Sequence, residues 1–231
     1  MKQKIIAQGA EAIITKEGEK IIKNRIPKSY RLPILDEQLR KKRTKSEAKI
    51  LEKLQGKVNV PKLLKQNQFD IEIEFINGDK LSNTLNSYTE KKQQTTMKLL
   101  GKELTKMHNL GIIHSDLTTS NMILVNNSKQ TPKKNNLPHQ HQIINTGSCQ
   151  ATIKESEAQK LYIIDFGLSF HSFRLEDKAV DLHLIKQALE AKHFQNYKKL
   201  YKSFISAYKP KDKKQVLAQL QEVESRGRYK H

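Results

Sequence analysis

The spacing of the apolar residues changes near residue 76 of this 231-residue chain, and that change limits the folds it can adopt. Before residue 76 the apolar residues form short, β-branched runs separated by turn residues, which indicate strands. One stretch in this part, from residue 36 to 54, indicates a helix. Its spacing of three and four residues is carried by Leu39, Arg43, Glu47, Ile50, Leu51 and Leu54. We therefore expect an α+β fold with a β-rich N-terminal lobe (1–76), a reduced helical C-terminal lobe (77–224) and a basic tail (225–231).

Residues 126–159 fit neither part of this pattern. They contain five Asn, five Gln and two Pro but no aromatic residue, so they can bury little apolar surface. We expect this segment to be a mobile insertion in the C-terminal lobe. His139, His141 and Cys149 within it could bind a metal ion, although histidines in a tract of this composition are more often exposed and unliganded.

The charge of the chain is strongly positive, with 43 Lys and Arg against 24 Asp and Glu and a net charge of +19. The excess is +9 in residues 1–60 and +7 in residues 198–231, which leaves only +3 between them. This distribution indicates a polyanionic partner, most commonly nucleic acid, and the alternative is a lysine-rich soluble surface. The basic residues expected to contact RNA are Arg40, Lys41, Lys42, Arg43, Lys45, Arg226, Arg228 and Lys230.

Cysteine content and hydropathy indicate the compartment. A single cysteine excludes an internal disulfide framework and fits a reducing environment. No apolar run approaches the roughly 20 residues that cross a bilayer. The N-terminus also lacks the apolar core of a secretion signal. We expect a cytoplasmic protein with no membrane partner, which would also be nuclear in a eukaryote.

The most specific motif is His114-Ser115-Asp116-Leu117-Thr118-Thr119-Ser120-Asn121, which matches the H-x-D-L-x-x-x-N spacing of kinase catalytic loops. In this spacing the Asp reaches the proton of the nucleophile. The Asn five residues later turns back to hold a metal ion against the nucleotide phosphates. Asp116 is therefore the candidate catalytic base, and Asn121 is a candidate metal ligand.

A second motif supports the same chemistry. Residues 161–167 read as a buried strand that ends in Asp165-Phe166-Gly167, and an Asp in this position can bind Mg²⁺ between the β- and γ-phosphates of ATP. A kinase also requires a lysine on an early strand and a glutamate on the following helix. Lys23 and Glu47 have these positions, so we predict that Lys23 neutralises phosphate charge and that Glu47 orients its ammonium group.

The predicted phosphate-binding segment departs from the G-x-G-x-x-G of protein kinases. It reads Gln8-Gly9-Ala10-Glu11-Ala12, in which the small alanines still allow backbone N–H groups to approach a phosphate. We predict that these five residues contact ATP. Glu74 and Ile76 bound the predicted hinge between the lobes, where backbone groups would form hydrogen bonds with adenine.

Seven segments, which span nearly the whole chain except residues 126–159, carry a resemblance to one family. They are Gly9-Ala10-Glu11-Ala12, the stretch from Lys23 to Arg31, Arg43-Thr44-x-x-Glu47-Ala48, the stretch from His114 to Asn121, Asp165-Phe166-Gly167-Leu168-Ser169, the stretch from Lys178 to Leu182, and Arg226-Gly227-Arg228. These segments resemble the small atypical, RIO-related serine/threonine kinase/ATPase subunit of the KEOPS (EKC) complex. Ser115 stands where that family usually has glycine.

The resemblance implies a two-lobed protein-kinase-like fold that uses ATP and Mg²⁺. It also implies a role in the synthesis of threonylcarbamoyladenosine beside the tRNA anticodon, with serine/threonine (auto)phosphorylation as a further activity. The implied partners are a metal-dependent carbamoyl-transferring subunit, other small KEOPS subunits and tRNA.

Three other functions remain open at this point. A small-molecule phosphotransferase of the aminoglycoside or choline type shares H-x-D-x-x-x-x-N but needs a large helical insertion in its C-terminal lobe. An inactive scaffold would not need Lys23, Asp116, Asn121 and Asp165 together. A basic RNA-binding module would rely on phosphate attraction, and the sequence shows no aromatic RNA-stacking motif.

The segment after the second motif limits the substrates. Only 13 residues separate Gly167 from Asp181, and they contain no Ala-Pro-Glu. This is too short for the platform on which protein kinases bind a peptide. The shortage favours ATP hydrolysis, or restricted phosphorylation within a complex.

Overall fold

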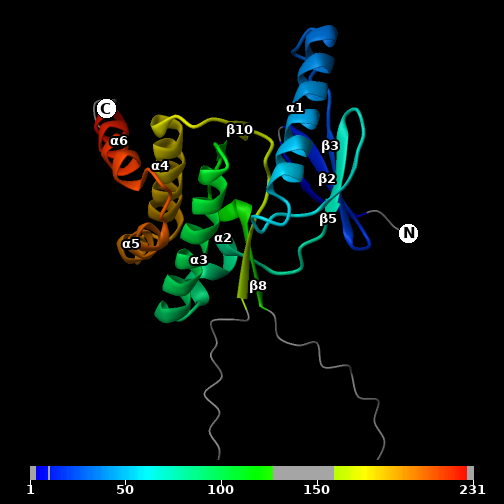
Figure 1. Ribbon diagram of the computed structural model, residues 1–231. Coiled ribbons are helices and arrows are strands. Elements are labelled where there is room, and N and C mark those ends of the chain that lie inside the picture. Colours follow the sequence, from blue (N-terminus) through cyan, green and yellow to red (C-terminus); the bar gives the residue numbers. More distant parts are fainter. Residues whose placement is uncertain (1–3, 10, 127–158, 228–231) are drawn as a thin grey trace, which may run out of the picture.

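The computed structural model describes residues 4–9, 11–126 and 159–227, which fold into two lobes (Figure 1). The expected α+β organisation is confirmed. The N-terminal lobe contains a five-stranded antiparallel sheet with the strand order β1-β2-β3-β5-β4. Its strands are β1 (Lys4–Gln8), β2 (Ala12–Glu17), β3 (Lys20–Arg25), β4 (Leu63–Gln66) and β5 (Asp70–Glu74).

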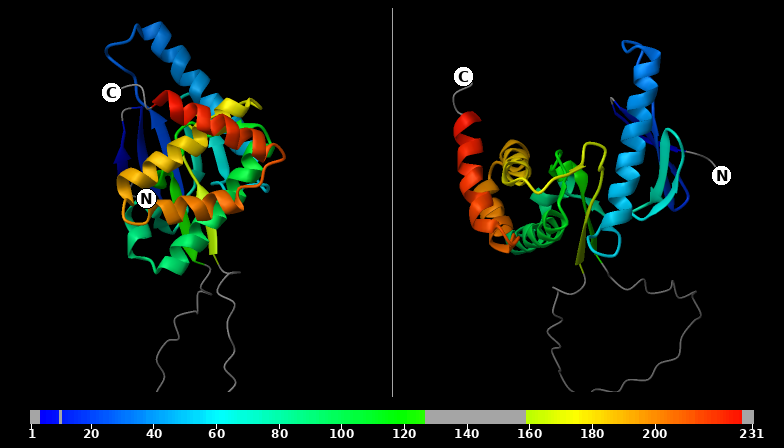
Figure 2. Two further views of the ribbon diagram at one scale, coloured as in Figure 1. Left: turned by 90° about the vertical axis from the view of Figure 1, so that its left-hand side faces the viewer. Right: turned by 45° about the horizontal axis from the view of Figure 1, so that its top comes forward.

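One long helix, α1 (Pro33–Leu54), covers a face of this sheet (Figure 2). The helix begins three residues before the expected start at residue 36. Pro33 occupies its first turn, where the N–H that proline lacks would have no partner inside the helix. Ala48, Leu51 and Leu54 are buried on the inner side of α1.

The C-terminal lobe is mainly helical, as the apolar spacing predicts. Its helices are α2 (Leu81–Thr84), α3 (Glu90–Asn109), α4 (Leu175–Lys192), α5 (Tyr197–Ala207) and α6 (Lys213–Gly227), with 3₁₀ turns at Leu85–Ser87 and Thr119–Asn121. Strands β6 (Asp79–Lys80), β8 (Met122–Asn126) and β9 (Gln159–Ile163) form one small sheet, and β7 (Ile112–Ile113) pairs with β10 (Phe170–His171). No helix in the described part of the chain is long and apolar enough to span a membrane.

The core of this lobe lies where three long helices meet the strands. Met97, Leu100 and Leu104 of α3 are fully buried, as are Leu182 of α4 and Phe204 of α5. This core supports β7 and the loop that follows it, because α3 ends at Asn109 and leads directly into β7. The catalytic motif therefore begins on a rigid base.

The end of the chain differs from the expected tail. Helix α6 continues to Gly227, so residues 225–227 are helical, and nothing between Val223 and Gly227 interrupts the helix. This helix lies on the side of the C-terminal lobe away from the N-terminal lobe (Figure 2). Arg228 and Lys230 lie outside the described residues.

The expected insertion is also shorter than residues 126–159. Asn126 ends β8 and Gln159 begins β9, and the two are direct partners in the antiparallel register. The Gln159 side-chain amide donates a hydrogen bond to Asn126 Oδ1 at 2.8 Å. Residues 127–158, which include His139, His141 and Cys149, lie outside the described part of the chain.

This register predicts that a two-residue turn can replace residues 127–158. Asn126 and Gln159 lie opposite each other, as the residues that flank an Asn-Gly hairpin turn do. We expect the free energy of unfolding in urea to equal that of the full chain or to exceed it by up to about 2 kcal/mol, because a shorter loop costs less entropy to close.

A control variant carries the same turn and also lacks Lys160. That deletion shifts the register by one residue and turns the buried Leu161 and Ile163 outward, so this variant should be much less stable. Equal stability of the two variants would contradict the register.

Candidate active site

Lys23 lies at the centre of a charge cluster between the lobes, in which Lys23 and Glu47 are buried and Asp165 is partly exposed. Its Nζ donates hydrogen bonds to Glu47 Oε1 at 2.8 Å and to Asp165 Oδ1 at 2.6 Å. These residues come from β3, from α1 and from the loop after β9. A Cβ atom on Gly167 would lie 3.2 Å from both Lys23 Nζ and Asp165 Oδ1, so glycine leaves room for the cluster. The structure brings together the lysine, the glutamate and the aspartate that the sequence predicted.

The charges of the cluster shift the pKa values of its members. Burial would lower the pKa of Lys23, but the negative charges of Glu47 and Asp165 outweigh burial and raise it. Burial would raise the pKa of Asp165, but the Lys23 charge, with hydrogen bonds from Lys23 and the Gly167 N–H, lowers it. Both groups are ionised at neutral pH. Because the folded-state pKa of Asp165 is depressed, its contribution to stability is present at neutral pH and is lost as the pH falls through that value.

Arg25 is a second cation in the cluster, and the sequence analysis assigned it no role. Its Nη2 donates to Glu47 Oε2 at 2.6 Å, and the residue is only 4% exposed. Lys23 and Arg25 are two residues apart on β3, so both side chains point to the same face of the sheet. That period-2 spacing is the signal that could have identified Arg25.

The phosphate-binding segment is held by ion pairs to α1 and to the loop before it. Glu11 accepts a hydrogen bond from Arg43 Nη1 at 2.6 Å and one from Arg31 Nη2 at 3.3 Å. Burial would raise the pKa of Glu11, but the two arginines lower it overall. Ala10, one of the predicted contacts, lies outside the described residues. Neither arginine was predicted to lie in the ATP site: Arg31 had no assigned role, and Arg43, one helical turn before Glu47, was expected to contact RNA.

The catalytic loop is shaped by His114. The His114 ring is fully buried; its Nδ1 accepts the Asp116 N–H at 3.3 Å, and its Nε2 lies 3.1 Å from the Ile164 carbonyl. Asn121 Nδ2 donates to the Asp116 carboxylate and to the Asp116 carbonyl, each at 2.9 Å. The loop therefore holds Asp116 and Asn121 against each other, as the five-residue spacing predicts.

Ser115 and Asp165 both have left-handed backbone conformations, each with φ of 64°. This conformation favours glycine, which explains why a glycine at position 115 suits such a loop. The Ser115 N–H donates to Asp181 Oδ1 at 2.8 Å, and this bond helps to hold the strained residue in place. Positive φ values at two points of the same cleft fit a site whose backbone is constrained by its surroundings.

Asp181 on α4 holds the backbone of the catalytic loop in place. Its carboxylate is fully buried and accepts the N–H groups of His114 and Ser115, each at 2.8 Å, while His108 Nε2 lies 3.1 Å from Oδ2. In the sequence, Asp181 lies in one of the seven segments that carry the family resemblance, and no role was predicted for its side chain. A buried Asp on a helix far along the chain gives no local signal of such a role.

A cavity of about 330 Å³ connects these groups. Its lining includes most of the predicted site residues together with two arginines that were not predicted: Gln8, Gly9, Glu11, Ala12, Lys23, Arg25, Arg43, Asp116 and Asp165. Glu47 lies behind Lys23, and Asn121 lies behind Asp116. The cavity does not reach the predicted hinge residues Glu74 and Ile76.

The oxygen atoms in this cleft suit a hard divalent cation. The carboxylate of Asp165 and the side-chain oxygen of Asn121 are ligands of the type that Mg²⁺ prefers. The Lys23 ammonium already compensates the charge of Asp165 at 2.6 Å, so this carboxylate is ionised and can serve as a ligand.

The segment after Gly167 is short, as the sequence indicates. Helix α4 begins at Leu175, so only residues 168–174 connect Gly167 to it. Within them, β10 pairs with β7, and the Ser169 hydroxyl donates to the His114 carbonyl at 3.0 Å. This segment supports the catalytic loop and leaves no long platform for a peptide.

Comparison with known proteins relates the chain to one group. A family model described as the RIO domain matches residues 19–131. The KEOPS complex subunit Bud32 of Pyrococcus abyssi is 32% identical over 244 residues, which cover 98% of this chain and 96% of that protein. The EKC/KEOPS complex subunit BUD32 of Enterocytozoon bieneusi is 33% identical over 237 residues, with coverage of 97% and 98%.

Two further comparisons concern a longer relative and the fold. A probable bifunctional tRNA threonylcarbamoyladenosine biosynthesis protein of Methanobrevibacter smithii is 32% identical over 98% of this chain, which spans only 37% of that protein. The Rio2 kinase–ADP/Mg²⁺–phosphoaspartate complex from Chaetomium thermophilum matches with a TM-score of 0.59 and 14% identity, covering 95% of this chain and 70% of that one. The latter likeness shows a protein-kinase-like fold.

The contacts of Asp181 predict a specific cost for its replacement. In Asp181→Asn the amide has one acceptor oxygen, while the carboxylate accepts two backbone N–H groups and faces His108. We expect the free energy of unfolding in urea to fall by about 1–3 kcal/mol because a buried donor loses its acceptor. Glu190→Gln, at an exposed position of the same helix, should unfold like the wild type. Equal stability of the two variants would show that the Asp181 carboxylate does not hold the loop.

Proposed function

Because the chain belongs to the family of KEOPS/EKC complex subunits that includes Bud32, we propose that it is an ATP- and Mg²⁺-dependent atypical kinase/ATPase that supports threonylcarbamoyladenosine modification of tRNA. The observation that carries this proposal is one cavity lined by Lys23, Asp116 and Asp165, with Glu47 and Asn121 directly behind. A scaffold without chemistry would not require this arrangement.

Each residue has a proposed role in phosphoryl transfer. Lys23, oriented by Glu47, binds the α- and β-phosphates of ATP. Asp116 accepts the proton of a water molecule or hydroxyl group as its oxygen bonds to the γ-phosphorus, while the bond to the β-phosphate oxygen breaks and ADP leaves. Backbone groups at Glu74 and Ile76 contact adenine, and Gln8, Gly9, Ala10, Glu11 and Ala12 lie along the phosphates.

Asp165 and Asn121 are the proposed Mg²⁺ ligands. The ion would neutralise charge on the β- and γ-phosphates as the transferred group leaves. Asp165 would hold the ion through its carboxylate, and Lys23 would then pair with the phosphates. The 2.6 Å contact between the two side chains shows that both can reach the same point in the cleft.

The phosphate acceptor is proposed to be water or a serine or threonine within an assembly, since residues 168–174 offer no long peptide platform. We propose that the partners are a metal-dependent carbamoyl-transferring subunit, other small KEOPS subunits and tRNA, in the cytoplasm. The bifunctional relative supports a close partner, because more than half of that protein lies outside the matched region.

The first test removes the proposed metal ligand. Asp165→Ala should abolish ATP hydrolysis, and Asp116→Ala should reduce it by roughly 10²–10⁴-fold if Asp116 is the general base. Asp70→Ala, on β5 and outside the cavity, should hydrolyse ATP like the wild type. Turnover is measured as phosphate release, and circular dichroism confirms folding. Normal turnover in a folded Asp165→Ala protein would overturn the assignment.

The second test concerns Glu11, whose carboxylate occupies Arg43 and Arg31 in the same cavity. Phosphate groups of ATP would compete with it for Arg43. Glu11→Gln should therefore lower KM for ATP, and Arg43→Gln should raise it, each by about two- to fivefold, as expected for a partly exposed ion pair. Glu37→Gln removes a carboxylate from an ion pair with Lys41 on the outer side of α1 and should leave KM unchanged. A higher KM in Glu11→Gln would show that this carboxylate helps to bind ATP.

A further inference from the structure

Six of the cations expected to contact RNA lie in the described part of the chain, and four of these six have acidic partners. Arg40 pairs with Asp36 at 2.7 Å, Lys41 with Glu37 at 2.5 Å and Arg43 with Glu11 at 2.6 Å. Arg226 pairs with Glu176 at 2.8 Å. These cations are less available to a phosphate backbone than the sequence indicates.

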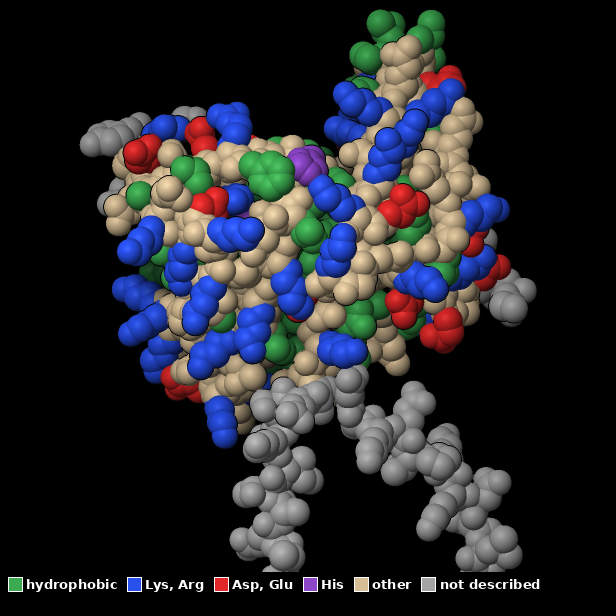
Figure 3. Space-filling view, viewed as in Figure 1, with side chains coloured by type: hydrophobic (Ala, Val, Ile, Leu, Met, Phe, Trp, Pro, Cys, Tyr) green, Lys and Arg blue, Asp and Glu red, His purple; other side chains and the backbone are tan. Residues whose placement is uncertain are grey.

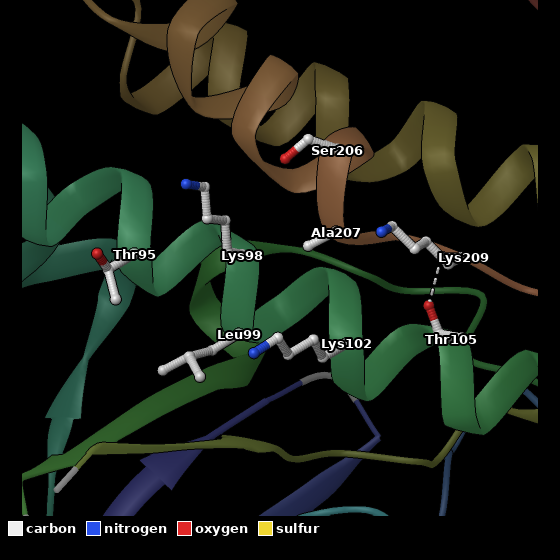
Figure 4. A pocket seen from close by; sticks show the side chains of 8 residues that line it. All are labelled: Thr95, Lys98, Leu99, Lys102, Thr105, Ser206, Ala207 and Lys209. Carbon is white, nitrogen blue, oxygen red and sulfur yellow. Dashed lines mark hydrogen bonds between the residues drawn. The ribbon is translucent and has the colours of Figure 1, made fainter. Parts of the chain in front are cut away.

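A groove between α3 and α5 is lined by lysines that, unlike the cations above, have no acidic partner in the described part of the chain (Figure 4). It has a volume of about 510 Å³, and its charged lining consists of Lys98, Lys102 and Lys209. All three lysines are exposed, and none forms an ion pair within the described part of the chain. Figure 3 shows lysine and arginine side chains gathered on the part of the surface over α3 and α5.

Close helix packing gives this groove a fixed shape. A Cβ atom on Gly101 would lie 2.5 Å from the Phe204 carbonyl oxygen, so only glycine allows α3 and α5 to approach this closely. At the other end, the Lys209 N–H donates to Thr105 Oγ1 at 2.8 Å. Lys98 and Lys102 are therefore presented by a rigidly packed helix, and Lys209, which follows the end of α5, has its backbone fixed to α3 by this hydrogen bond.

Two further lysines, one on each helix, lie beyond the three that line the groove. Lys91 is seven residues before Lys98 and so lies on the same side of α3, and Lys202 is one turn before the groove residue Ser206 on α5. Both are exposed and have no ion pair among the described residues. We call Lys91, Lys98, Lys102, Lys202 and Lys209 the α3–α5 face.

We propose that the α3–α5 face binds the sugar–phosphate backbone of RNA. The proposal rests on the proposed role in tRNA modification for the identity of the polyanion, and on the charge of the surface for its location. Unpaired lysines are point charges that attract phosphate without base readout. The face contributes no large exposed hydrophobic side chain from α3 or α5 in the described structure.

The lysine-rich composition of the α3–α5 face fits RNA better than it fits a protein partner or a membrane. Protein interfaces are enriched in aromatic residues and arginine and depleted of lysine, the reverse of this face. A membrane-binding face combines lysine with apolar side chains that enter the lipid, and these are missing from both helices as described. The site is independent of the ATP cavity, which shares none of its lining residues.

The test uses the full chain and an unmodified tRNA transcript. In the triple variant Lys98→Gln/Lys102→Gln/Lys209→Gln, tRNA affinity should fall roughly 10²-fold at 0.1 M salt. The slope of log K against log[salt] should become shallower by about 2–3, since each lost phosphate contact removes about 0.7–0.9. Fluorescence anisotropy across a salt series measures both quantities.

The control variant is Lys49→Gln/Lys57→Gln/Lys65→Gln, which removes the same charge from exposed positions of the N-terminal lobe. It should keep most of the affinity, and both triple variants should hydrolyse ATP at the wild-type rate. Unchanged binding by the groove variant, equal losses in the two variants, or no binding by the wild type would overturn the proposal. So would selective loss of binding to phosphatidylglycerol vesicles with tRNA binding retained. None of these results bears on the Asp165→Ala test of the ATP site.

Discussion

One ammonium group, that of Lys23, connects the two lobes through Glu47 on α1 and Asp165 after β9. Burying the charges of Lys23 and Glu47 costs about as much as their attraction supplies, but removing either of these two buried partners leaves the other uncompensated at a cost of about 3–5 kcal/mol. The fold meets this constraint by placing β3 at the centre of its five-stranded sheet, with α1 held across it. The positions of the phosphate-binding segment and of the catalytic loop both follow from that placement.

The parts of this arrangement that depend on local sequence could be predicted. Asp116 and Asn121 meet because a five-residue loop allows it, and Asp165 follows a strand whose apolar run is evident in the sequence. The parts that depend on distant contacts could not be predicted. Asp181 reaches the catalytic loop from 67 residues away, and the Arg43 partner Glu11 lies 32 residues before it in the chain.

The distribution of charge over the surface is a second property that could not be predicted from the sequence. Summed along the chain, the basic excess lies at the ends, yet several terminal cations are paired, while α3 belongs to the nearly balanced middle. Lys98 and Lys102 face outward, whereas the acidic residue directly after Lys102, Glu103, turns inward and accepts the Asn59 N–H at 2.9 Å. A sum over sequence cannot separate these two directions, because the helix repeats every 3.6 residues and a window of residues averages all its faces.

The pairing of β10 with β7 has a consequence for how such a protein can be controlled. In signalling kinases, a long segment after Asp-Phe-Gly alternates between ordered and disordered states, and phosphorylation selects one of them. Here residues 168–174 are few, and the strand they contain is already committed to a neighbour. The segment therefore lacks the length on which such a phosphorylation switch depends. Under the proposed function, we expect ATP turnover to be controlled by the partners of the chain and not by phosphorylation of this segment.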